Sequence, residues 1–169
     1  MLRSSSHLSV RKAKVTDAKA LAKVFAESWR HAYRGIIPHL HLETMIQRRG
    51  PECWQNALRS GESVLVMEVC GDMVGYATWG VSRTRGKPQG EIYELYVTPS
   101  HQGLGFGEHL FEACRYQLDQ RKLKGLIVWA LLANTPAINF YWRRGGRPVG
   151  RTFDKIGGAK LEKIAFTWG

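Results

Sequence analysis

The segment Glu91-Ile92-Tyr93-Glu94-Leu95-Tyr96-Val97 leads, past Pro99, into Gln102-Gly103-Leu104-Gly105-Phe106-Gly107. The first stretch is rich in strand-forming residues, the proline ends it, and an apolar helix pattern follows the glycines. A helix that begins at such a loop presents free backbone N–H groups and the positive end of its dipole to an anion. Glycines let the backbone approach the anion closely. Taken alone, these glycines indicate an anion-binding loop.

Two common glycine-loop sites do not fit this sequence. A nucleotide P-loop requires Gly-Lys-Ser/Thr, which is absent. A dinucleotide fingerprint has its third glycine one residue later than Gly107, lies early in a βαβ unit and is followed by an acid about 20 residues on. Here the loop follows three strands that read as antiparallel.

Outward from the loop, the pattern predicts an α+β fold. Three helices are expected before the loop: one that begins at Thr16 or Asp17, one over 39–47 and one that begins at Pro51. Two more are expected after the loop. The first has Leu110 and Phe111 on its apolar side, and the second is short and begins at Asn134. Strands are expected over 8–13, 63–69, 73–79, 91–97, 126–132, 149–154 and 160–167, with the last two closing the sheet. We predict one mixed, mostly antiparallel sheet with helices on both faces.

Composition predicts a single domain over residues 1–169, with a loose N-terminus at 1–6. The chain is 44% hydrophobic and contains six tryptophans, which supply a sizeable core and exclude disorder. Its three cysteines form no CxxC pair, as in a reduced, cytoplasmic protein. No apolar run approaches the roughly 18 residues of a membrane span. We therefore expect a cytoplasmic protein with no membrane partner.

The formal charge of +11 could reflect nucleic acid, an anionic cofactor or a basic surface. The basic residues are spread along the chain, and there is no RNP-like aromatic strand, Cys/His finger or basic zipper. The sequence therefore does not favour nucleic acid as a partner.

The pattern that fits the loop is Gln-x-x-Gly-x-Gly, formed by Gln102, Gly105 and Gly107, five residues after the valine that ends a strand. With the segment from Asn134 to Tyr141 and the order of the predicted elements, the chain resembles the GNAT superfamily of N-acetyltransferases over almost its whole length. This chain departs from the family pattern after Tyr141, where Gly145-Gly146 is followed by arginine instead of the usual phenylalanine.

The resemblance implies that acetyl-CoA is the co-substrate and that its pyrophosphate binds the loop, from Gln102 and Gly103 through Leu104, Gly105, Phe106 and Gly107 to Glu108. The pantetheine arm would lie along the strand at Leu95 and Val97, where two central strands splay apart, and it would bond to Asn134. No metal is implied, and family members are often dimers, so a homodimer is one expected assembly.

An ammonium group near pH 7 must lose a proton before its nitrogen can attack a thioester, and the departing thiolate benefits from gaining one. Tyr141, seven residues after Asn134, matches the family's proton donor, and a phenol suits that role. The alternative is that Tyr141 is one more aromatic residue of an apolar helix face.

For the base, Glu91 and Glu94 lie three apart on one strand, so we expect them on opposite faces. In the histone-acetyltransferase branch of the family the catalytic glutamate matches Glu91. The alternatives are that Glu91 pairs with Arg83 or Arg85 and that Glu94, a histidine or a water relay serves as base.

The N-terminal helices shape the acceptor site in this family, which points to Trp29 and Tyr33 as substrate-binding residues. His31, His39 and His41 lie nearby, but no cysteine or carboxylate completes a metal-ligand spacing, so we predict no metal. The predicted activity is direct acetyl transfer to a primary amine on a small molecule or peptide. The alternatives are an acyl-CoA sensor without turnover and a basic RNA- or ribosome-associated protein.

Overall fold

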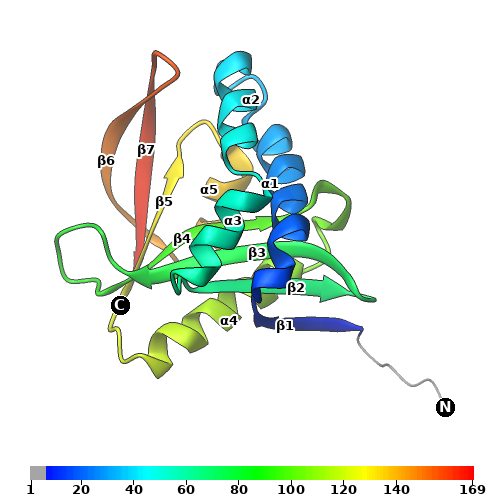
Figure 1. Ribbon diagram of the computed structural model, residues 1–169. Coiled ribbons are helices and arrows are strands. Elements are labelled where there is room, and N and C mark those ends of the chain that lie inside the picture. The colour runs from blue at the N-terminus through cyan, green and yellow to red at the C-terminus, as the bar shows by residue number, and fades with distance from the viewer. Residues whose placement is uncertain (1–6) are drawn as a thin grey trace.

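The computed structural model describes residues 7–169, which form one seven-stranded sheet in the order β1-β2-β3-β4-β5-β7-β6 (Figure 1). Among the strands of residues 7–169, only β4 and β5 pair in parallel, which confirms the mixed, mostly antiparallel sheet. The strands are β1 Leu8–Lys12, β2 Val64–Val69, β3 Asp72–Val81, β4 Gly90–Val97, β5 Leu126–Leu131, β6 Arg147–Ile156 and β7 Ala159–Trp168. The loose N-terminus expected at residues 1–6 lies outside the described residues.

The expectation that the last two strands close the sheet is wrong. β7 pairs with β5, and β6 pairs only with β7, so these strands extend one side of the sheet. β1 remains the opposite edge, and the sheet is open. The β6–β7 hairpin instead reaches toward α2 (Figure 1), where a Cβ built on Gly157 would lie 2.7 Å from the Cβ atom of His41.

Helices cover both faces of the sheet, as predicted. α1 Ala18–Tyr33, α2 His39–Arg48 and α3 Pro51–Arg59 belong to one face, and α4 Phe106–Gln120 and α5 Thr135–Arg143 belong to the other. Two short 3-10 turns, Val15–Asp17 and Pro99–His101, precede α1 and α4. None of the helices within residues 7–169 is both long enough and apolar enough to cross a membrane.

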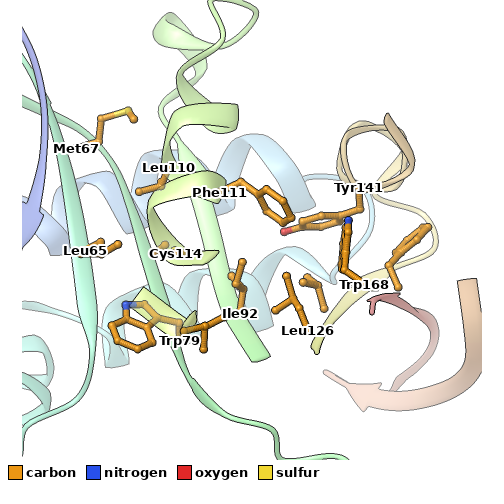
Figure 2. Close-up of a cluster of buried hydrophobic side chains, with 14 of the residues drawn as sticks. Leu65, Met67, Trp79, Ile92, Leu110, Phe111, Cys114, Leu126, Tyr141 and Trp168 are labelled. Carbon is orange, nitrogen blue, oxygen red and sulfur yellow. The ribbon is translucent and has the colours of Figure 1, made fainter. Parts of the chain in front are cut away.

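Each face has its own hydrophobic core. The α4 side buries Leu110, Phe111 and Cys114 with residues of β2, β3, β4, β5 and β7 (Figure 2), and the α1 side packs Phe25 and Trp54 against Tyr76. Each large apolar side chain buried in this way stabilises the fold by roughly 1.5–3 kcal/mol. The two cores hold the sheet between the helix layers and so fix the position of its central strands.

A β-bulge in β4 changes which face its side chains reach. Trp79 pairs with Ile92 and Thr78 pairs with Glu94, so Tyr93 is an extra residue on β4. Ile92 packs in the α4-side core, and the neighbouring Glu91 therefore points toward the other face, as Glu94 does. The expectation that Glu91 and Glu94 lie on opposite faces is wrong, because simple alternation does not hold across a bulge.

Candidate active site

A gap opens between the two central strands. Within residues 7–169, β4 and β5 pair only at Gly90–Leu126 and Glu91–Ile127, and no strand pairs with the rest of β4 on that side, which confirms the splayed strands. The N–H of Thr98 donates to the carbonyl of Val74 on β3. Because backbone groups alternate along an antiparallel strand, those of Leu95 and Val97 point away from β3 and into the gap. This edge can accept an extended ligand as an additional strand.

The glycine loop lies at the open end of this gap. Gly103 and Gly105 have φ values of 77° and 81°, and a Cβ atom built on either would contact nothing within 4 Å. Gly105 caps α4, and within residues 7–169 no acceptor is bonded to the backbone N–H groups of residues 103–108. The side-chain amide of Gln102 donates to the carbonyl of Val97 at 3.0 Å, which ties the loop to the end of β4. The loop therefore presents a row of unpaired donors at a helix N-terminus.

The third glycine of the loop has a different role. A Cβ atom on Gly107 would lie 3.2 Å from the ring of Phe140 on α5, so this glycine allows α4 and α5 to pack closely. Glu108, in the first turn of α4, faces Arg144 at 3.6 Å. Leu104 is largely exposed, whereas Phe106 packs against the core on the α4 side. The loop thus has an open face toward solvent and a packed face toward α5.

Tyr141 lies in the core between α5 and the sheet, with its ring between Phe111 and Trp168 and its hydroxyl directed away from α5 (Figure 2). The side chain is only 6% exposed, and this burial raises the pKa of Tyr141 well above that of an ordinary phenol. The hydroxyl makes no hydrogen bond to any residue from 7 to 169. It therefore stays protonated at neutral pH and is available to donate to a ligand.

Asn134 and Tyr33 lie beside the same region. The Oδ1 atom of Asn134 accepts a bond from the N–H of Ala137 at 3.4 Å, so this residue caps α5 as predicted. Burial raises the pKa of Tyr33, and its hydrogen-bonding contacts with Tyr96 and Asn134 act in the opposite direction. The hydroxyls of Tyr33 and Tyr96 are 2.5 Å apart. α1, β4 and the start of α5 thus bring polar side chains to one place.

Tyr96 was not among the residues singled out in the sequence. Its side chain is partly buried against the α1-side core, and burial raises the pKa of Tyr96 well above its ordinary value. Trp29 is 4.9 Å from the ring of Tyr33 and 6.0 Å from that of Tyr96. The two predicted substrate residues, Trp29 and Tyr33, therefore form one aromatic group with Tyr96. The only signal in the sequence is that Tyr96 lies two positions after Glu94 and so shares its face.

Glu91 lies at the closed end of the gap, where β4 and β5 are still paired. It is 1% exposed, and its carboxylate accepts hydrogen bonds from the backbone N–H and the guanidinium of Arg83, both at 2.9 Å. The alternative of an ion pair with Arg83 is therefore confirmed. Catalysis by Glu91 stays a prediction, because the ion pair does not by itself exclude it.

The carboxylate of Glu94 is also bound by neighbouring side chains. Arg49 binds both of its carboxylate oxygens, at 2.8 and 2.5 Å, and Tyr76 and Thr78 donate to them as well. The guanidinium of Arg49 stacks over Trp54 at 4.4 Å. A partly buried carboxylate with four donors joins α2 and α3 to the sheet and leaves Glu94 no free oxygen for an acceptor amine.

The three histidines near the acceptor side do not converge on one point. His31 lines a hollow with Arg30, Arg34 and Ser100, whereas His41 packs against the β6–β7 hairpin. No group of three or more histidine, cysteine or acidic side chains in the described part of the chain could hold a metal ion. The indole N–H of Trp129 on β5 donates to the hydroxyl of Thr84 at 2.9 Å.

The chain was compared with known protein families, curated proteins and solved structures. Residues 22–146 match the acetyltransferase (GNAT) family. An uncharacterised N-acetyltransferase of Bacillus subtilis, YuaI, is 30% identical over 95% of this chain and 92% of its own length. The PaiA N-acetyltransferase of Thermoplasma acidophilum, solved with coenzyme A, superposes with a TM-score of 0.73 at 17% identity, covering 95% of this chain and 99% of the other. The YncA protein of Salmonella typhimurium, solved with acetyl-CoA, superposes with a TM-score of 0.68 at 19% identity, covering 96% of this chain and 93% of the other.

Proposed function

Because this chain belongs to the GNAT family of acetyltransferases, we propose that it transfers an acetyl group from acetyl-CoA to a primary amine. The observation that carries this proposal is the combination of the splayed strands with the unpaired loop donors at their open end. A ligand that has both an anionic group and an extended amide-bearing arm matches this combination. Two structures of the same fold, solved with coenzyme A or acetyl-CoA, support this choice of co-substrate.

The proposed placement follows the local chemistry. The backbone N–H groups of residues 103–108 would bind the pyrophosphate, aided by the dipole of α4. The outward-facing backbone groups of Leu95 and the N–H of Val97 would pair with the amides of the pantetheine arm, since the carbonyl of Val97 already accepts from Gln102. Asn134 would bond to the same arm. The acetyl group would then lie near Tyr33, Tyr96 and Tyr141.

The reaction requires one bond to form and one to break. The amine nitrogen attacks the carbonyl carbon of the thioester, the carbon–sulfur bond breaks, and the electron pair leaves with sulfur. The nitrogen loses one proton, and the sulfur gains one, which gives an amide and a free thiol. We propose Tyr141 as the donor to sulfur, because its hydroxyl is protonated and has no partner among residues 7–169.

The proposed activity is tested by incubating the protein with acetyl-CoA and a panel of primary amines and measuring thiol release. The panel contains alkylamines, amino-acid amides, spermidine and a short peptide. We expect amine-dependent release well above the rate without amine. Binding of acetyl-CoA without release for any amine would favour the acyl-CoA sensor instead.

Glu91 is tested as the general base by comparing Glu91→Gln with Arg83→Ala. If Glu91 removes the amine proton, Glu91→Gln should lower kcat/KM by roughly 10²–10⁴. Arg83→Ala should lower it much less, because the carboxylate remains. Similar modest losses in both variants would show that the pair is only structural.

A further inference from the structure

The hollow that His31 lines lies between α1 and the 3-10 turn Pro99–His101, which precedes the glycine loop. It has a volume of about 460 Å³. Charged and hydroxyl side chains make up most of its walls, together with the ring of one proline. The lining residues are Glu27, Arg30, His31, Arg34, Pro99 and Ser100. The hollow is therefore suited to a small polar ligand.

This hollow is separate from the proposed reaction centre. Glu27, His31 and Arg34 are spaced by four and three residues, so they lie along one side of α1. Trp29 and Tyr33, which belong to the aromatic group at the reaction centre, are each two residues from His31 and project from the opposite side of the helix. A molecule in the hollow would thus be separated from the acetyl group by α1.

The hollow contains unpaired charges of both signs. The guanidinium of Arg30 is already paired, because it donates to both carboxylate oxygens of Glu43 at 2.9 Å. That bond and, to a smaller extent, the charge of Arg34 lower the pKa of Glu43. Within residues 7–169, the side chains of Glu27, His31 and Arg34 make no hydrogen bond or ion pair. One carboxylate and one guanidinium without partners therefore line the same hollow.

These two charges favour a ligand that itself carries both signs. Glu27 and Arg34 are seven residues apart, about 10.5 Å along the axis of α1, and they do not pair with each other. A simple anion would be repelled by Glu27, and a simple cation would be repelled by Arg34. The hydroxyl of Ser100, which is bonded to Nδ1 of His101 at 3.0 Å, can still donate to or accept from a ligand.

We propose that this hollow binds a small zwitterion of the amino-acid type, with its carboxylate on Arg34 and its ammonium group on Glu27. Each charge of the ligand then gains a charge-assisted hydrogen bond, and both unpaired side chains gain a partner. This binding site goes beyond the acetyl-transfer function, because its ligand is held away from the thioester.

The test is a ¹H–¹⁵N NMR titration of the protein, without acetyl-CoA, with glycine and 4-aminobutyrate as probes. We expect saturable shifts of the backbone amides of residues 27–34 and 100–101. Acetate and methylamine each keep one charge of glycine, and butyrate and butylamine each keep one charge of 4-aminobutyrate. These four should bind at least about fivefold more weakly than the parent zwitterion.

Three results of the titration would overturn the inference. The first is the absence of saturable shifts with both zwitterions. The second is a set of shifts centred on the β4–β5 gap instead of the hollow. The third is equal binding of the zwitterion and of the anion that keeps only its carboxylate, which would indicate a plain anion site.

Two variants locate the ligand. Glu27→Gln and Arg34→Gln should each weaken binding of the zwitterion at least about fivefold, because each removes one charge partner. Lys23→Gln is the matched control, since Lys23 is an exposed charged residue one turn earlier on α1 and does not line the hollow. Equal weakening in all three variants would overturn the site. The titrations contain no acetyl-CoA, so a failure of this site and a failure of the proposed acetyl transfer are seen in different experiments.

Discussion

Replacing Tyr141 with phenylalanine is expected to lower kcat by roughly 10²–10⁴, with little change in the affinity for CoA. The change removes one hydroxyl and keeps the ring that packs against Phe111, Phe140 and Trp168. The departing thiolate then lacks its proton donor, while the loop and the strand edge remain. Steady-state kinetics at saturating amine, together with calorimetric titration of CoA, separate the two effects.

The pKa of Tyr141 adds a condition to this expectation. Because burial raises that pKa, the phenol remains protonated up to and beyond about pH 10, where an ordinary tyrosine ionises. The wild-type kcat should therefore show no alkaline decline from this residue below that pH. Tyr116→Phe is the matched control, since Tyr116 is an exposed tyrosine on α4. Wild-type kcat in Tyr141→Phe would remove Tyr141 from the mechanism.

Gly105→Glu is expected to lower the affinity for CoA by roughly 100-fold or more, which corresponds to about 2.7 kcal/mol. Gly105 caps α4 with a φ of 81°, and the space above its Cα atom is open in the structure. A glutamate there would place bulk and negative charge where we propose that the pyrophosphate binds. Repulsion between like charges at a helix N-terminus then adds to the steric block.

The control for this variant is Gly61→Glu. Gly61 has a φ of 83° and equally open surroundings, but it lies after α3, outside the glycine loop. Both variants carry a side chain in the left-handed region, so the strain of roughly 1–2 kcal/mol is matched. Only Gly105→Glu should lose CoA binding. Retained binding in Gly105→Glu, or equal loss in both variants, would contradict the loop assignment.

Most of the fold was predictable because each element carries a local signal. Pro51 begins α3, Asn134 caps α5, and the apolar run at 126–132 became β5, which is buried along its first half. The open sheet was not predictable, because the pairing of β7 with β5 and of β6 with β7 depends on long-range contacts. The residue pattern within β6 or β7 does not indicate whether the strand extends one edge of the sheet or closes the sheet.

The candidate site was predicted in part. The loop and the cap at Asn134 follow from motifs with a backbone mechanism, whereas the gap was expected only from the family resemblance. The sequence did not predict which face of the sheet Glu91 lies on, because no pattern of residue types marks the bulge at Tyr93. The contact between Tyr33 and Tyr96 was missed because the two residues are 63 positions apart and meet only through packing.

In the proposed reaction, the acetyl group moves from acetyl-CoA to an amine nitrogen at the open end of the β4–β5 gap. Its most direct test uses acetyl-CoA labelled in the acetyl group, with hexylamine as acceptor, and follows labelled amide and free thiol by mass spectrometry. We predict one labelled amide for each thiol released by the wild-type protein, and neither product above background from Gly105→Glu. Thiol release without labelled amide, or equal amide formation by both proteins, would contradict the claim.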